Sequence, residues 1–221
     1  MNTHNFSGSV VLCDFDGTIV NIDTAQRVLE LFADPSWRRI EKEFEKSEVS
    51  FEESLRKEYE LIAAAPETIL RELDRITTVR PRFDELIQHC ESNHIPLVVL
   101  SGGLDFYIKH FLQRENWLDS ISIHAPKTQR TANGYEVTFP KRLVTSSVNF
   151  KVDLVRFHKG RGDRVFFIGD GIADFPSAKE SDYVFAIRDS KLAKLCRNEN
   201  VTCKEIDDFQ PVIDALGNSS E

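Results

Sequence analysis

Short apolar runs that end abruptly in polar residues recur along the chain. Three are continuously apolar, as strands covered on both faces are: Val10–Cys13, Pro96–Leu100 and Val165–Ile168. Two further runs predict shorter strands, at Tyr183–Ile187 and at Val201–Lys204. The spacing of these runs leaves room for a helix between most successive strands.

Apolar positions three and four residues apart predict those helices. Between Asp23 and Leu73 the spacing, with breaks at Pro35, at 47–50 and at Pro66, predicts four helices. Later helices are predicted at Arg82–Asn93, Phe106–Phe111, Phe150–His158, Lys191–Asn198 and Phe209–Leu216.

A different pattern lies between the second and third apolar runs. Ile121–Ile123 and Tyr135–Phe139 alternate in the manner of strands, and Asn133-Gly134 is a strong turn signal between them. We expect a small hairpin or two short strands.

Strands that alternate with helices predict an α/β fold with a three-layer parallel core. The helical stretch after the first strand is too long for an ordinary connection, so we expect an inserted cap at residues 21–79. The core would then comprise residues 1–20 and 80–221, and the cap would cover the strand ends.

Composition narrows the possible partners. The 221 residues carry a net charge of −8 and no cluster of Lys and Arg, which argues against nucleic-acid binding. No apolar stretch is long enough to span a membrane, and the opening residues MNTHNFSGS lack the features of a signal peptide. We therefore expect a cytoplasmic protein. We also expect a monomer or a homodimer, and we expect the last residues, GNSSE, to fray.

The four cysteines show no metal-binding or disulfide pattern. Cys13, Cys90, Cys196 and Cys203 form no CxxC pair and have no His at ligand spacing, so we expect reduced, structural thiols. Strand alternation also directs Cys13 away from the face of the neighbouring aspartates.

Chemistry is expected where the apolar runs end. The first run leads into Asp14 and Asp16, the second into 101–103 (Ser-Gly-Gly), and the third towards Asp170 and Asp174. Carboxyl ends of parallel strands meet at one edge of a sheet, which is where ligands bind in such folds. On their own, the first two acids could form a metal site, an acid/base pair or a turn.

Together these residues suit phosphoryl transfer. Clustered carboxylates repel one another, and an all-oxygen set favours Mg²⁺, which binds through a few carboxylates and substrate oxygens. Asp14 and Asp16 fit the roles of nucleophile and of general acid/base. Lys151, Ser101 and the Gly102 amide could neutralise the transferred phosphoryl group.

The order DFDGT, LSGG, a single Lys and GDGIAD resembles the haloacid dehalogenase superfamily over essentially the whole chain. The resemblance implies a Rossmann-like core with a cap, with Asp14 as nucleophile and Asp16 as general acid/base. It also implies that Ser101 and Lys151 hold the phosphoryl group. Mg²⁺ would bind Asp14, the Asp16 backbone carbonyl and Asp170, with Asp174 as an outer support or a further ligand.

The helical insertion resembles the cap of the phosphoserine phosphatase-like branch, in which a Glu stands where this chain has Asp23. Asp23 is therefore a candidate substrate-binding residue, although the shorter side chain weakens a phosphoserine assignment. Arg56 and Lys57 are candidates for holding a substrate carboxylate. LSGGLDFYI and ADFPSAKESDYVFA are similar to the methionine-salvage phosphatases, but residues 126–147 lack the Cys-rich segment of bacterial members.

The substrate expected from these features is a small phosphorylated metabolite. A phosphotransferase, or a binding protein that keeps the fold without catalysis, would use the same residues. Asp105 and Phe106 could reach the cleft, although Phe106 at helical spacing from Phe111 could equally be core. Trp37 and Phe44 could line a substrate pocket in the cap, but we expect them to pack the cap's own small core.

Overall fold

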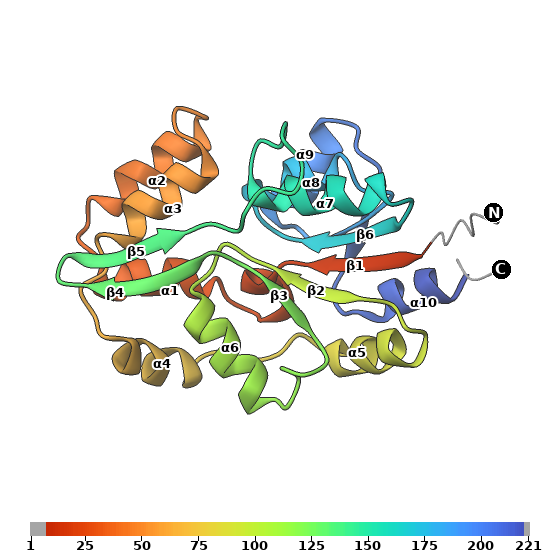
Figure 1. Cartoon of the computed structure of the whole chain (residues 1–221), viewed down its shortest axis with the longest axis horizontal. Coiled ribbons are helices and arrows are strands. Elements are labelled where there is room, and N and C mark those ends of the chain that lie inside the picture. The colour runs from red at the N-terminus through yellow and green to blue at the C-terminus, as the bar shows by residue number, and fades with distance from the viewer. Residues whose placement is uncertain (1–7, 219–221) are drawn as a thin grey trace.

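A six-stranded parallel sheet forms the centre of the molecule (Figure 1). The computed structural model describes residues 8–218, so the expectations for residues 1–7 and 219–221 lie outside the described part of the chain. The strand order is β3-β2-β1-β6-β7-β8. The strands are β1 (Ser9–Cys13), β2 (Leu97–Leu100), β3 (Ser122–His124), β6 (Arg164–Gly169), β7 (Tyr183–Ile187) and β8 (Lys204–Ile206).

Helices cover both faces of this sheet. Figure 1 shows α7, α8 and α9 on one face and α5, α6 and α10 on the other. Their bounds are α5 (Phe83–Ser92), α6 (Asp105–Arg114), α7 (Phe150–Gly160), α8 (Phe175–Ala178), α9 (Lys191–Asn198) and α10 (Gln210–Asn218). The expected three-layer α/β architecture is confirmed.

The register of the central strands explains why polar residues meet at one edge. Cys13, the last residue of β1, pairs with Val99 of β2 and with Ile168 of β6. All three strands are parallel and apolar, and residues 10–13 of β1 are fully buried. The chain therefore leaves β1, β2 and β6 at the same edge, and the residues that follow them become neighbours.

The segment after β1 contains four helices: α1 (Thr24–Phe32), α2 (Trp37–Glu45), α3 (Phe51–Tyr59) and α4 (Pro66–Asp74). Its two connections to the sheet run side by side, because Val20 bridges to Val79 and the Arg80 amide donates to the Ile19 carbonyl. The four predicted helices are confirmed. The division into a core and a cap at residues 21–79 stays a prediction.

Of the two alternatives for residues 121–139, a hairpin between Ile121–Ile123 and Tyr135–Phe139 is wrong, and two short strands are confirmed. Residues around Ile121–Ile123 form β3, which extends the main sheet beside β2 rather than pairing with a hairpin strand. The hairpin consists of β4 (Lys127–Thr131) and β5 (Gly134–Thr138), and it reaches towards the cap helices (Figure 1). Arg130 donates to the Ala63 carbonyl at 2.6 Å, and the Tyr135 hydroxyl donates to the Ala64 carbonyl at 2.9 Å.

Three smaller expectations are also corrected. The last strand begins at Lys204 and not at Val201, because the Val201 amide still donates to the Cys196 carbonyl as the chain leaves α9. The short helix α8 and the 3₁₀ turn before it, Ile172–Asp174, were not expected. Helix α10 continues to Asn218, beyond the point where fraying was expected.

Two expectations about compartment and thiols can be compared with the structure. No helix within residues 8–218 combines the length and the apolar character that crossing a membrane requires. All four cysteines are free thiols, three of them buried and Cys203 half-buried.

Candidate active site

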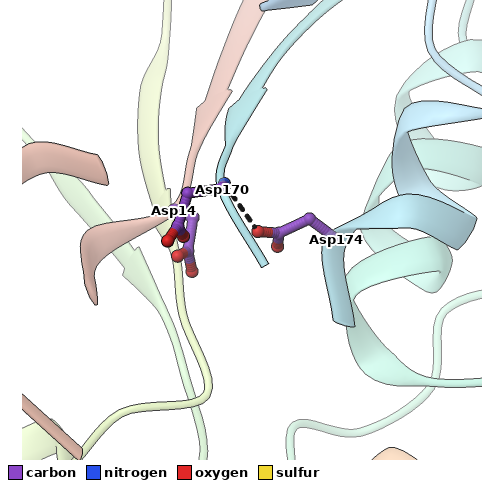
Figure 2. A group of neighbouring side chains, drawn as sticks. All are labelled: Asp14, Asp170 and Asp174. Carbon is purple, nitrogen blue, oxygen red and sulfur yellow. Dashed lines mark hydrogen bonds between the residues drawn. The ribbon is translucent and has the colours of Figure 1, made fainter. Parts of the chain in front are cut away.

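The edge of the sheet brings together the carboxylates predicted from the sequence. Asp14 follows β1 and Asp170 follows β6, so both lie at adjoining strand ends, while Asp174 reaches towards them from the start of α8 (Figure 2). One carboxylate oxygen from each lies within 4.8 Å of the others. Three acids from two separate parts of the chain therefore form one cluster.

Lys151 is the buried cation of this cluster. It lies in the first turn of α7, where the Asn149 side chain caps the helix by accepting from the Val152 amide. The Lys151 ammonium donates to Asp14 Oδ1 and to Asp174 Oδ1, both at 2.7 Å, and its side chain is only 3% exposed. Burial alone would lower the pKa of Lys151, but these two carboxylates raise it above its ordinary value.

Asp174 uses its second oxygen for the backbone. Its Oδ2 accepts from the amides of Asp170, at 3.1 Å, and Gly171, at 3.0 Å, and Figure 2 shows the first of these bonds. A Cβ at Gly169 would lie 2.6 Å from Asp174 Oδ2, so only glycine allows this close approach. Asp174 therefore fixes the loop that carries Asp170.

The pKa values of Asp14 and Asp170 are raised in the folded protein. Burial and the charge of Asp174 raise the pKa of Asp14 well above its ordinary value, although Lys151 opposes this shift. Burial and Asp174 also raise the pKa of Asp170 to about 8. Asp170 Oδ1 accepts from the Thr18 hydroxyl at 3.3 Å. Both shifts come first from burial and second from repulsion within the cluster, and the positive charge of Lys151 opposes them.

The turn after β1 depends on Gly17 and Arg80. Gly17 has φ of +67°, and a Cβ there would lie 2.3 Å from Asp170 Oδ2, so a side chain is excluded by both conformation and space. Arg80 donates to the carbonyls of Gly17 and Thr18 at 2.8 and 2.7 Å. The turn is therefore held from the return segment of the cap.

Asp16 lies on the side of the turn that faces the cap. Its Oδ1 accepts from the amide of Thr24, at 2.9 Å, and from the Thr24 hydroxyl, and its Oδ2 accepts from Ser101 Oγ at 3.4 Å. Burial, together with the charge of Asp23, raises the pKa of Asp16 to about 7. The group is thus poised to exchange a proton near neutral pH.

Ser101 is placed differently from the other predicted site residues. It is fully buried, and its Oγ accepts from the Gly103 amide at 2.9 Å while donating to Asp16. The cavity above the cluster is lined by Gly102 and Gly103 rather than by Ser101. Ser101 therefore orders the 101–103 loop and the side chain of Asp16.

The acidic cluster fits a hard divalent cation. Asp14, Asp170 and Asp174 offer only carboxylate oxygens, and their spacing allows all three to face one ion. The raised pKa values of Asp14 and Asp170 indicate that added positive charge would stabilise the ionised carboxylates. Asp16 does not belong to this side-chain group, so the prediction of its backbone carbonyl as a ligand stays a prediction.

A cavity of about 310 Å³ lies between the cluster and the cap helices. Its inner end is lined by Asp14, Asp16, Lys151, Asp170 and Asp174. Its outer part is lined by polar residues Asp23, Glu41, Glu45, Glu58 and Lys191, and by aromatic residues Trp37, Phe44, Phe51 and Tyr59. Residues of the acidic cluster and residues of α1, α2 and α3 therefore line one space.

The cavity corrects some expectations about the cap. Trp37 and Phe44 line it and do not only pack the cap's interior. Asp23 lines it as well, while its side chain caps α1 by accepting from the Gln26 amide at 2.7 Å. Glu41, Glu58 and Lys191 were not singled out from the sequence, where nothing distinguishes them from neighbouring charged helix residues.

Four other candidates lie outside the cavity lining. The Arg56 guanidinium stacks on Phe139, and Lys57 pairs with Glu53 on the surface of α3. Asp105 accepts from the amide and hydroxyl of Thr128, and the Phe106 ring stacks on Tyr135, so both residues support the hairpin. The structure brings none of these four residues to the cavity.

Comparison with known proteins agrees with this architecture. Residues 11–179 match the model of the haloacid dehalogenase-like hydrolase family. The chain is 31% identical over 207 residues to the 2-hydroxy-3-keto-5-methylthiopentenyl-1-phosphate phosphatase of Bacillus cereus strain B4264, covering 91% of this chain and 93% of that protein. The corresponding phosphatase of Bacillus mycoides strain KBAB4 is 30% identical over 211 residues, covering 93% and 94%.

Solved structures show the same fold. A substrate-bound phosphoserine phosphatase aligns with a TM-score of 0.68 at 20% identity, covering 94% of this chain and 98% of that one. A phospho-aspartyl intermediate analogue of phosphoserine phosphatase aligns with a TM-score of 0.67, also at 20% identity, covering 95% and 99%. The expected Rossmann-like fold and enzyme class, a phosphoric monoester hydrolase, are confirmed. The chain belongs to the haloacid dehalogenase-like hydrolase family.

Proposed function

We propose that the protein is a Mg²⁺-dependent phosphatase of small metabolites that works through an aspartyl phosphate on Asp14. The observation that carries this proposal is the position of Asp14 at the inner end of the cavity, where Lys151 holds its Oδ1. Within residues 8–218 its Oδ2 accepts no hydrogen bond, which leaves that oxygen available to attack phosphorus.

Asp14 and Asp16 would divide the chemistry. An Asp14 oxygen forms a bond to phosphorus while the bond from phosphorus to the ester oxygen breaks, and protonated Asp16 gives its proton to the departing oxygen. Asp16 then takes a proton from the water that cleaves the acyl phosphate, which releases inorganic phosphate and restores Asp14. The pKa of Asp16, about 7, suits both directions of transfer.

The surrounding residues would stabilise the transferred phosphoryl group. Lys151 supplies positive charge, and the 101–103 loop supplies backbone amides at the cavity wall. Mg²⁺, when bound, neutralises phosphoryl oxygens and supports in-line displacement. We assign its binding to Asp14, Asp170 and the Asp16 carbonyl. Asp174 fits a supporting role, since both of its oxygens already accept hydrogen bonds.

Residues 21–79 would act as the cap that selects the substrate. Their helices contribute most of the outer cavity lining, including Asp23 at the start of α1. The names of the Bacillus relatives make 2-hydroxy-3-keto-5-methylthiopentenyl-1-phosphate the first substrate to test. Phosphoserine is the alternative from the solved structures, but neither Arg56 nor Lys57 lines the cavity to hold its carboxylate.

Replacing the nucleophile tests the proposal. Asp14→Asn should lower kcat for p-nitrophenyl phosphate at saturating Mg²⁺ by about 1,000-fold or more, because an amide cannot form the intermediate. Asp119→Asn, at an exposed turn, serves as the matched control and should leave kcat unchanged. Retention of most activity in Asp14→Asn, after mass spectrometry has excluded deamidation, would contradict the proposal.

A further inference from the structure

The outer part of the cavity is acidic and has little opposing charge. Four acids line it, Asp23, Glu41, Glu45 and Glu58, and no arginine does. Among residues 8–218, the single cation that lines this outer part is Lys191, which pairs with Glu45 at 2.9 Å across the gap between α9 and α2. Lys151 belongs to the inner end, where Asp14 and Asp174 share it.

Glu58 is the least solvated of these acids. It is 8% exposed, and its carboxyl makes no hydrogen bond to any residue between 8 and 218. Burial, with added repulsion from Glu41 and Asp23, raises its pKa to about 8. A buried carboxyl without a hydrogen-bond partner lowers the stability of the fold. A donor group of a ligand would therefore form a hydrogen bond to Glu58 without displacing one inside the protein.

A second unpartnered group lines the same cavity. Trp37 is 3% exposed, and its indole nitrogen is buried without a hydrogen-bond acceptor. Trp37 comes from α2 and Glu58 from α3, so two separate helices each contribute to the cavity lining a side chain without a hydrogen-bond partner among residues 8–218. The remainder of the wall is largely apolar, with Phe44, Phe51 and Leu55.

The acids of the outer cavity would face the leaving group of the substrate. Because the phosphoryl group must lie against Asp14, its ester substituent points into the outer cavity between Glu58 and Asp23. Above pH 8, where Glu58 is ionised, a carboxylate on that substituent would meet the charges of Asp23, Glu41 and Glu58 without a free cation, and like charges brought together in a binding site weaken binding. Hydroxyl or amine hydrogens would instead meet acceptors that lack donors.

We propose that the cavity selects phosphomonoesters whose leaving group carries no anionic group and presents hydroxyl or amine donors to Glu58 and its acidic neighbours. The inference rests on the proposed function for the position of the phosphoryl group. It goes beyond that function by assigning Glu58 a role in specificity and by excluding leaving groups that carry a carboxylate.

Binding of matched phosphonates tests the inference without turnover. In 3-aminopropylphosphonate and 2-amino-4-phosphonobutyrate a methylene replaces the ester oxygen, and the second compound differs from the first by one carboxylate. Calorimetry on the wild-type protein with Mg²⁺ at pH 9, above the pKa of Glu58, should show at least about tenfold weaker binding of the carboxylate compound. A third ligand, 3-hydroxypropylphosphonate, separates a preference for ammonium from one for hydroxyl.

Variants on α3 locate the effect. Glu58→Gln should narrow the ratio of the two dissociation constants at least about threefold, because it removes the buried acid. Glu53→Gln, on the same helix but outside the cavity, should leave the ratio unchanged. Equal affinities in the wild type, no affinity for either compound, or an unchanged ratio in Glu58→Gln would overturn the inference. Intact preference without hydrolysis of any phosphomonoester would overturn the proposed function alone.

Discussion

The inner and outer parts of the cavity both contain acids, but the acids of the two parts differ in their hydrogen-bond and ion-pair partners. At the inner end Asp14 and Asp174 share the buried ammonium of Lys151, and Asp16 accepts from Thr24. In the outer part Glu58 is equally enclosed and has no comparable partner.

The difference separates two tasks. In the proposed function the inner acids must keep one geometry through the reaction, which fits their bonds to a lysine, hydroxyls and backbone amides. The outer acids would contact a variable part of the substrate, and we propose that the ligand supplies their partners.

Removing Lys151 should break the inner arrangement most severely. Lys151→Met leaves Asp14 and Asp174 buried without their cation, which costs about 3–5 kcal/mol of unfolding free energy. Activity should also fall about 1,000-fold. Lys159→Met is the control, because the Lys159–Asp182 pair is partly exposed and is worth less than about 1 kcal/mol. Equal losses of stability in the two variants, measured by urea unfolding, would refute the comparison.

In the outer part, replacing Glu58 should have a smaller effect on the unfolding free energy, and the effect should be stabilising. The folded state raises the pKa of Glu58 from 4.5 to about 8, so unfolding releases its proton between these values. The resulting stabilisation is complete below pH 4.5 and is lost as pH rises towards 8. Glu58→Gln does not titrate, so it should exceed the wild type in unfolding free energy by roughly 2 kcal/mol at pH 8.

Denaturant unfolding at pH 5 and pH 8 measures this gain. The advantage of Glu58→Gln should shrink at pH 5, and Glu53→Gln should show no comparable change between the two pH values. A Glu58→Gln variant that is less stable than the wild type at pH 8 would mean that the carboxylate has a partner in the folded protein.

The smallest effect concerns the hydrogen bond that links α3, in the outer part of the cavity, to the loop after β2. The buried Tyr59 hydroxyl donates to the Gly102 carbonyl at 2.8 Å, which links α3 to the loop after β2. Tyr59→Phe should cost about 1 kcal/mol of stability and lower kcat/KM several-fold, since Gly102 lines the cavity. Tyr135→Phe removes a similar bond, to Ala64, outside the cavity. It should lose similar stability with kcat/KM unchanged; an equal loss of kcat/KM would disprove a special role for Tyr59.

The inner part of the site could be predicted because its information is local. Asp14 and Asp16 follow an apolar strand, Asp170 follows another, and parallel strands necessarily end at one edge. Lys151 could be found because it opens a helix at the expected point in the chain. Hydrogen bonds such as Lys151 to both Asp14 and Asp174 needed the structure.

The outer part could not be predicted because burial there depends on packing between helices. Glu58 and Glu53 lie on the same helix with similar neighbours in sequence, yet one is buried in the cavity and the other pairs with Lys57 on the surface. Strand β4, Lys127–Thr131, was missed for a related reason. It has no apolar alternation, and it is recognisable as a strand only through its pairing with β5.

The most direct test of the central claim is chemical trapping of the intermediate. The wild-type protein is mixed with Mg²⁺ and a hydrolysed phosphomonoester, quenched in acid and reduced with borohydride, which converts an aspartyl phosphate to homoserine. Peptide mass spectrometry should find homoserine at position 14 only when both substrate and Mg²⁺ are present. Hydrolysis of the substrate with position 14 unmodified, or with homoserine at another aspartate, would contradict the account.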